Sequence, residues 1–209
     1  MAEYRLYCFA ESGNAYKAAL MLELCGLDWE ARKVDFFGGE TRTPDYRRTV
    51  NEMGEVPVLE HGDRHLTQSG VILDYLSGQS GRFGAESDDE RRDIWRWILF
   101  DNHKLSSYLA TLRFLVSLAK TGETPVTEFL RGRAMAALKI TDGHLAGSDF
   151  IVGGRATIAD LSMCGYLYFG DELSVDLTAF GHLQAWLGRI AGLPGWRHPY
   201  DLMPRAYGG

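Results

Sequence analysis

The chain has 209 residues, of which 45% are hydrophobic and 24% charged, and its formal net charge is −6 at pH 7. That length suffices for one large domain or two smaller ones with cores of their own. The charge balance gives no support for a nucleic-acid or membrane-surface partner, and three cysteines without a CxxC pair are typical of a reduced protein. No signal peptide and no run of about 20 apolar residues is present, so the sequence predicts a cytoplasmic protein.

The first elements of the chain predict a strand, a polar turn and a helix. Residues 3–9 form a short apolar strand, and residues 12–17 (SGNAYK) form the turn. Apolar residues recur at helical spacing over 15–25, and Gly26 follows where a left-handed C-cap is needed. The turn places a hydroxyl group and unpaired backbone N–H groups at a helix N-terminus. Such an end attracts an anion such as a thiolate.

Further strands and one helix complete a mixed pattern over the first eighty residues. A second strand is predicted over 29–35, and a hairpin over 56–60 and 64–66. A helix is predicted over 69–76, with Ser69 as its N-cap by residue type. The order β-α-β and then β-β-α predicts a small mixed sheet with helices packed on it.

The remainder of the chain has helical periodicity alone. Residues 77–81 (SGQSG) have the composition of a linker, and Thr157 with Asp160 forms a predicted capping box. The predicted helices cover 89–120, 126–146, a stretch from Thr157 and 177–191. The sequence therefore predicts an α/β domain over residues 1–78 and an all-helical domain over residues 86–209.

Two later features of the first domain are suited to bind a ligand. Pro57 opens a strand, where its missing N–H is tolerated, and X–Pro bonds adopt the cis form far more readily than other peptide bonds. In the cis form, the Val56 N–H and C=O would be free to pair with a peptide-like ligand. Gln68 and Ser69 stand at a second helix start.

These features, in this order, resemble the glutathione transferase superfamily over essentially the whole chain. The S-x-N-x-x-K first turn of a bacterial type is matched by Ser12, Asn14 and Lys17. The N-x-x-G-x-V-P-V-L element is matched by Asn51, Gly54, Val56, Pro57, Val58 and Leu59. The Gln-Ser pair is matched by Gln68 and Ser69, and G-x-x-x-T-x-A-D by Gly153, Thr157, Ala159 and Asp160.

The resemblance implies a thioredoxin-like N-terminal domain, a helical-bundle C-terminal domain, a cis Pro57, glutathione as co-substrate, no metal, and a homodimer. It implies that Val56 pairs with the cysteinyl part of glutathione and that Gln68 and Ser69 hold the γ-glutamyl carboxylate. A residue of the helical domain would bind the γ-glutamyl amino group, for which Asp101 and Asn102 are candidates. The implied catalytic residue is Ser12, and the implied binding residues are Asn14, Glu55, Val56, Pro57, Gln68, Ser69 and Asn102.

In this interpretation, Ser12 donates its hydroxyl to the glutathione sulfur, because only the thiolate is reactive. Tyr7 and Tyr16 are rival donors. Asn14 either binds the backbone and holds the turn or contacts the ligand. Lys17 is either solvated or structurally paired, or it contributes to the anion site or to loop packing.

Three functions remain open from the sequence. The first is a transferase that attacks a small hydrophobic electrophile or a peroxide, with an apolar pocket for which the candidates are Tyr108, Leu112 and Phe114. The second is a non-catalytic interaction module. The third is a glutathione-dependent isomerase, whose typical first turn has a second serine and a cysteine that this chain lacks.

Overall fold

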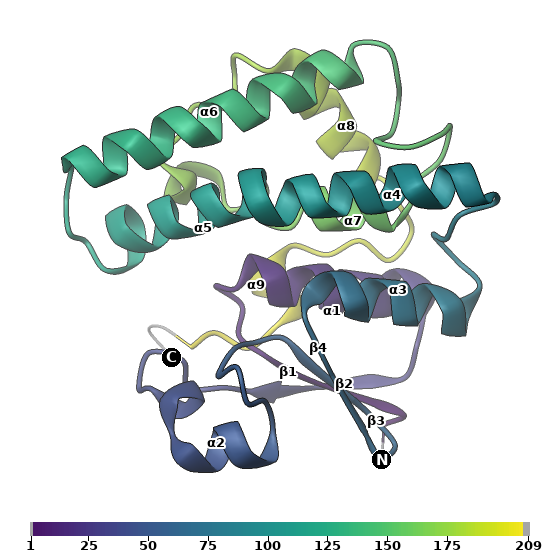
Figure 1. Cartoon of the computed structure of the whole chain (residues 1–209), viewed down its shortest axis with the longest axis vertical. Coiled ribbons are helices and arrows are strands. Elements are labelled where there is room, and N and C mark those ends of the chain that lie inside the picture. Colours follow the sequence, from purple (N-terminus) through teal and green to yellow (C-terminus); the bar gives the residue numbers. More distant parts are fainter. Residues whose placement is uncertain (1, 207–209) are drawn as a thin grey trace. The chain divides into compact units, whose positions relative to one another are not determined.

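The computed structural model describes residues 2–206 and forms two compact units (Figure 1). The first unit contains the residues up to Arg82 together with the segment from Leu193 onward, and the second unit spans Phe83–Gly192. The sequence assigned the whole of residues 86–209 to the second domain. The structure differs there, because residues 193–206 belong to the first unit.

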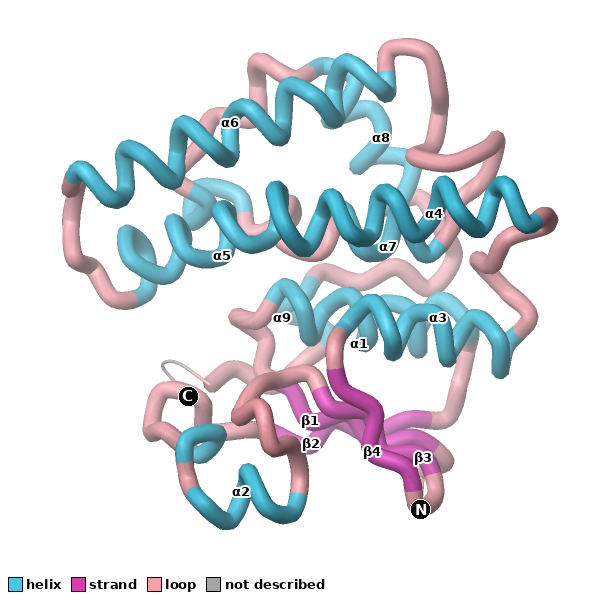
Figure 2. The backbone as a smooth tube through the Cα atoms, viewed as in Figure 1, coloured by secondary structure: helices cyan, strands magenta, loops and turns pink. Residues whose placement is uncertain are grey.

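A four-stranded mixed sheet forms the base of the first unit, drawn in magenta in Figure 2. Its strands are β1 (Tyr4–Cys8), β2 (Trp29–Lys33), β3 (Val58–His61) and β4 (Arg64–Thr67), in the order β2-β1-β3-β4. β1 and β2 are parallel, whereas β1–β3 and β3–β4 are antiparallel. The predicted thioredoxin-like fold of this part of the chain is confirmed.

Helices α1 (Gly13–Cys25) and α3 (Ser69–Ser80) pack side by side on one face of this sheet (Figure 1). α1 ends as predicted, because Gly26 adopts the left-handed conformation (φ 65°) and Leu27 N–H donates to the Leu22 carbonyl at 3.1 Å. α3 continues through residues 77–80, so the predicted linker is helical. The sequence missed the 3₁₀ turn Glu40–Arg42 and the helices α2 (Pro44–Thr49) and α9 (Pro199–Leu202).

The second unit is all-helical over its described residues, as predicted. The helices are α4 (Asp88–Phe100), α5 (Ser106–Arg113), α6 (Pro125–Leu145), α7 (Ile158–Met163) and α8 (Gly181–Ala191), with a 3₁₀ turn at Gly170–Leu173. Two π-helical stretches, Asp101–Leu105 and Phe114–Leu118, keep the chain helical from Asp88 to Leu118, so the helix predicted over 89–120 ends two residues early. Within residues 2–206, none of the helices has both the length and the apolar character needed to cross a membrane.

The predicted capping box at the start of α7 is present and reaches further than predicted. Asp160 is fully buried, and its carboxylate accepts hydrogen bonds from the backbone N–H groups of Thr157 and Ile151 and from Trp186 Nε1, each at 2.8 Å. Burial raises the pKa of this carboxyl, although the hydrogen bonds oppose that shift. Asp160 therefore joins α7 to α8 in the core of the second unit.

Candidate functional site

The three ligand-binding features predicted for the first domain leave its sheet at one end. Tyr7 of β1 lies opposite Val58 of β3, which lies opposite Thr67 of β4. Because β3 is antiparallel to both neighbours, the chain leaves β1 and β4 at the end where it enters β3. All three features therefore emerge from that end of the sheet: Ser12, Val56-Pro57 and Gln68-Ser69.

Ser12 is the N-cap of α1 and is only 7% exposed. Its backbone is extended (φ −88°, ψ 108°), and its Oγ accepts a hydrogen bond from the Ala15 N–H at 3.1 Å. A hydroxyl group has one proton and two lone pairs, so capping leaves the proton available to donate. Within residues 2–206, this proton has no acceptor.

The first turn of α1 offers further donors beside this hydroxyl. The N–H groups of Gly13 and Asn14 have no hydrogen-bond partner among the described residues, and the positive end of the helix dipole lies there. The Asn14 Oδ1 atom is buried and also lacks a partner in the described part of the chain. Within residues 2–206, the Asn14 side chain therefore does not hold the turn by a hydrogen bond, and its contact with a ligand stays a prediction.

Within residues 2–206, the start of α3 has more backbone N–H groups without a hydrogen-bond partner than the start of α1. Gln68, and not Ser69, occupies the N-cap position, with a strained backbone (φ 67°, ψ 116°) and no side-chain capping bond. A residue in such a region costs about 1–3 kcal/mol, and such strain clusters at ligand sites. Ser69 is the first helical residue and is 5% exposed, and the N–H groups of residues 69–71 have no partner among residues 2–206. This arrangement is suited to hold a carboxylate.

Val56 supplies an unpaired stretch of backbone between these helix starts. The Val56–Pro57 peptide bond is cis. β3 begins two residues later, and neither the N–H nor the C=O of Val56 has a partner in the described chain. Both groups are therefore available to an extended peptide ligand.

The residue before Val56 is held by two side chains, Asn51 of the predicted motif and Tyr46, which the sequence did not indicate. The Glu55 carbonyl accepts hydrogen bonds from the Tyr46 hydroxyl and from Asn51 Nδ2, each at 3.0 Å. Tyr46 and Asn51 are 3% and 5% exposed. The Glu55 carboxylate accepts a hydrogen bond from Gln68 Nε2 at 3.0 Å, which links this loop to the start of α3. The Thr43-Pro44 helix-start signal could have revealed α2, which carries Tyr46.

The two rival tyrosines use their hydroxyl groups elsewhere. The Tyr7 hydroxyl donates to Glu60 Oε2 at 3.2 Å, and its ring packs in a cluster with Val34, Tyr46 and Val58. Burial, followed by the Glu60 carboxylate, raises the pKa of Tyr7. Tyr16 is fully buried, and its hydroxyl donates to the Arg197 carbonyl at 2.8 Å.

The other candidate residues have mixed outcomes. Lys17 is fully buried, so the interpretation as a solvated surface lysine is wrong. Asp101 is also fully buried, and its two carboxylate oxygens accept from the hydroxyl groups of Ser106 and Ser162. Asn102 is exposed, and its Nδ2 donates to the Ile98 carbonyl at 2.8 Å.

The candidates for the electrophile pocket lie in the second unit and differ in exposure. Leu112 is fully buried and belongs to the core of that unit, so it is unsuited to line an open pocket. Phe114 is 40% exposed. Tyr108 is partly exposed, and the Arg133 guanidinium lies over its ring, 5.3 Å from the centroid.

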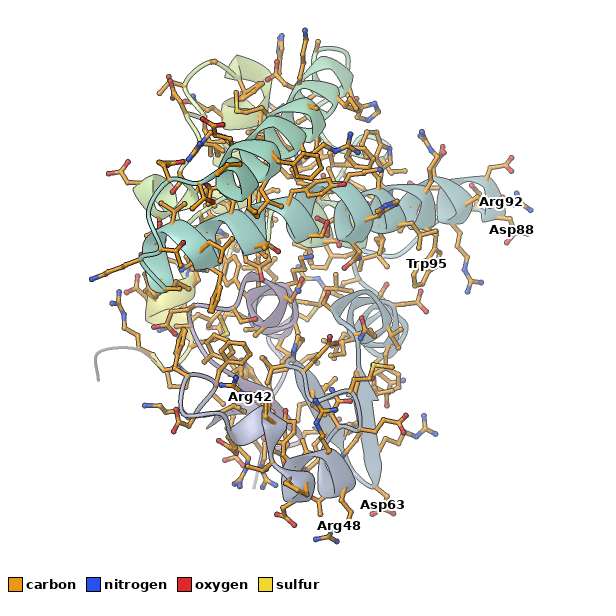
Figure 3. The ribbon with its side chains drawn as sticks, turned by 60° about the vertical axis from the view of Figure 1, so that its left-hand side comes forward. Arg42, Arg48, Asp63, Asp88, Arg92 and Trp95 are labelled. Atoms are coloured by element: carbon orange, nitrogen blue, oxygen red, sulfur yellow. The ribbon has the colours of Figure 1, made fainter. Side chains whose placement is uncertain are left out.

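A separate shallow cavity of about 300 Å³ lies between the end of α2 and β4. None of the predicted site residues lines it. Its cationic side chains are already engaged, because Arg48 pairs with Asp45 and Arg47 donates to the Glu52 carbonyl. Figure 3 shows the Arg48 side chain projecting away from the ribbon. The cavity therefore adds nothing to the candidate site.

Comparison with known proteins shows the family of the chain. The family model for the glutathione S-transferase N-terminal domain matches residues 2–78, and that for the C-terminal domain matches residues 105–194. The crystal structure of a glutathione S-transferase from Pseudomonas fluorescens Pf-5 is 32% identical with a TM-score of 0.90, covering 96% of this chain and 100% of that one. The chain belongs to the glutathione S-transferase family.

Two further relatives of this transferase-family chain bear on ligand and reaction. A glutathione transferase family member from Pseudomonas fluorescens Pf-5, crystallised with two glutathione bound, is 25% identical with a TM-score of 0.81 and covers 93% and 90% of the two chains. A maleylacetoacetate isomerase from Rhizobium meliloti (strain 1021) is 29% identical over 95% of this chain and 97% of its own.

Proposed function

We propose that this protein is a glutathione transferase that ionises the thiol of glutathione for attack on a small hydrophobic electrophile or a peroxide. The observation that carries the proposal is the state of Ser12. Its Oγ accepts from the Ala15 N–H, its proton has no acceptor within residues 2–206, and it stands at the N-terminus of α1. A crystallised family relative with glutathione bound supports the choice of ligand.

The proposal assigns each part of glutathione to one feature of the first unit. Ser12 donates to the sulfur, with the N–H groups of the α1 start and the Asn14 amide beside it. The Val56 backbone pairs with the cysteinyl residue, with Pro57 fixing the strand entry and Glu55 the loop before it. Gln68, Ser69 and the start of α3 hold the γ-glutamyl carboxylate.

Asn102 stays the proposed partner for the γ-glutamyl amino group. Its Nδ2 is used by the Ile98 carbonyl, which leaves Oδ1 to accept from an ammonium. Asp101 is excluded from this role by its burial beneath two serine hydroxyl groups.

The energy required is within reach of these groups. A free thiol has a pKa near about 8.5, and each unit of depression requires about 1.4 kcal/mol of preference for the thiolate. One hydrogen bond to a charged group contributes about 1.5–3 kcal/mol. Ser12 and the neighbouring N–H groups can therefore lower the thiol pKa by the one to two units that make thiolate abundant at neutral pH.

The test combines calorimetry with ultraviolet titration of the bound thiolate. Wild-type protein binds glutathione with measurable heat and a thiol pKa below that of free glutathione. Ser12→Ala keeps most of the binding but returns the pKa toward the free value, and Ser12→Thr, which retains the hydroxyl, restores it. Ser87→Ala is the matched control. Ser87 caps α4 in the equivalent way, because its Oγ accepts a hydrogen bond from the Glu90 N–H at 3.2 Å. An unchanged pKa in Ser12→Ala would remove Ser12 from the mechanism.

A glutathione-dependent isomerase is the second candidate, favoured by the Rhizobium meliloti relative. The same thiolate site serves both reactions, but a transferase consumes glutathione whereas an isomerase returns it unchanged. Assaying free thiol during turnover of a chlorodinitrobenzene and of a cis-olefinic diacid distinguishes the two. Absence of any heat with glutathione would instead favour an interaction module.

We further propose a homodimer acting in the cytoplasm. Sedimentation velocity tests the assembly, and a single monomer boundary contradicts it.

A further inference from the structure

The C-terminal segment of the chain runs along α1 toward the turn that carries Ser12. α9 packs on α1 (Figure 1), and at its start the Arg197 carbonyl accepts from the Tyr16 hydroxyl at 2.8 Å. Leu202 and Met203 follow and are 8% and 5% exposed, so they anchor the segment in the core of the first unit. Beyond Met203 the chain reaches the two residues that precede Ser12.

Two hydrogen bonds join this segment to the Ser12 turn. The Ala10 N–H donates to the Pro204 carbonyl at 2.8 Å, and the Ala206 N–H donates to Glu11 Oε2 at 3.0 Å. Ala10 is fully buried and Glu11 is 5% exposed. The turn also closes on itself, because the Ser12 N–H donates to the Phe9 carbonyl at 3.1 Å. The two residues before Ser12 are therefore hydrogen-bonded to residues about 190 positions later in the chain.

We propose that residues 204–206 are a positioning element for the thiol site, which fixes the direction of the Ser12 hydroxyl toward the glutathione sulfur. The inference rests on the proposed function. A hydroxyl donor stabilises a thiolate only within a narrow range of distance and angle, and a supporting shell that loosens by about 1 Å can cost up to about a hundredfold in rate. Within residues 2–206, no hydrogen bond joins residues 204–206 to the start of α3, where the carboxylate of glutathione is proposed to bind.

The decisive variant removes one donor and no functional side chain. Ala206→Pro deletes the N–H that binds Glu11, and Ala206→Gly retains it and serves as the matched control. A deletion from Pro204 onward removes both bonds and is the second variant. For each protein we measure the thiol pKa of bound glutathione and the affinity for S-methylglutathione, which has no thiol proton but keeps both carboxylates.

We expect Ala206→Pro and the deletion to raise the thiol pKa and to lower kcat/KM below neutral pH by about tenfold, with S-methylglutathione affinity unchanged. The Ala206→Gly variant should match the wild type. A wild-type thiol pKa in Ala206→Pro overturns the inference, as does an equal loss of S-methylglutathione affinity, because that would indicate general structural support. Failure of the proposed function is recognised separately, by wild-type protein that does not lower the thiol pKa at all.

Discussion

The helices α3 and α7 differ in whether the first three backbone N–H groups have hydrogen-bond acceptors. At α7 the first three N–H groups all have protein acceptors: residue 158 donates to the Phe83 carbonyl at 2.9 Å, 159 to Thr157 Oγ1 at 3.3 Å and 160 to the Thr157 carbonyl at 3.0 Å. At α3 the corresponding three groups have no acceptor among residues 2–206, and the residue before them, Gln68, is strained. We call the start of α7 closed, because its first N–H groups have acceptors within the protein, and the start of α3 open, because its first N–H groups have none among residues 2–206.

The closed start contributes to stability, whereas the open start is suited to bind a ligand. A closed start satisfies donors that would otherwise lose a hydrogen bond on burial, so it stabilises the second unit. An open start forgoes that gain, and backbone strain adds to its cost, which is the pattern expected where a ligand supplies the missing acceptor. The start of α1 is intermediate, because Ser12 satisfies one N–H and leaves two.

The largest effect is expected from removing the buried carboxylate of Asp160, which belongs to the capping box at the start of α7. Asp160→Ala leaves the Thr157, Ile151 and Trp186 donors buried without an acceptor, and each costs about 1–3 kcal/mol. We expect the free energy of unfolding to fall by about 3–5 kcal/mol in urea titrations, with glutathione affinity unchanged where the variant is folded. Asp176→Ala, which removes an exposed carboxylate bonded to Thr178, is the control and should have little effect.

A second variant weakens the support of the backbone at Glu55 and Val56, which lies between the starts of α1 and α3 in the chain. Tyr46→Phe removes the hydroxyl that donates to the Glu55 carbonyl, so Val56 is held less firmly and glutathione should bind about three- to tenfold more weakly. The thiol pKa in the complex should not change, because Ser12 is untouched. Tyr168→Phe loses an equivalent bond, to the Leu187 carbonyl at 2.9 Å in the second unit. Equal affinities in the two variants would contradict this role of Tyr46.

The effect of backbone strain at Gln68 can be measured separately from the effect of its side chain. Gln68→Ala and Gln68→Gly both lose the bond to Glu55, but only glycine adopts a positive φ freely. We expect the glycine variant to be more stable than the alanine variant by about 1 kcal/mol in thermal or chemical unfolding, with similarly weakened glutathione binding in both. Equal stabilities would show that the backbone at this position carries no strain.

The last effect is absent at neutral pH and concerns the thiol of Cys8, which is buried in the core of the first unit, in contrast to the thiol of glutathione at the start of α1. Burial raises the pKa of Cys8 from 9.0 to about 12. Between these values the unfolded chain releases the proton while the folded chain keeps it, so this contribution to stability is complete below pH 9 and declines above it. The expected decline is about 1.4 kcal/mol per pH unit, measured as the difference between wild type and Cys8→Ala. Parallel pH dependences in the two proteins contradict it.

Local signals in the sequence predicted those parts of the fold that depend on near neighbours. Gly26 marked the end of α1, and Thr157 with Asp160 marked the start of α7. Residues 77–80 were misassigned because Gly78 and the serines favour a loop, whereas burial of Leu76 and Ser77 on the sheet extends the helix.

Features that depend on long-range contacts could not be predicted in this way. The site candidates Ser12, Val56 and Ser69 were found from short motifs, but the Tyr46 bond and the positive φ of Gln68 arise only when α2 and α3 pack on the sheet. The bonds of Pro204 and Ala206 to the Ser12 turn join opposite ends of the chain, and no periodicity indicates them.

The central claim is that the open starts of α1 and α3 receive the thiolate and the carboxylate of glutathione. Amide NMR of isotope-labelled protein during a glutathione titration tests it most directly. The account predicts large shifts and slowed hydrogen exchange at the N–H groups of residues 13, 14 and 69–71, with those of residues 158–160 unchanged. Saturating glutathione that leaves residues 13, 14 and 69–71 unmoved would contradict it.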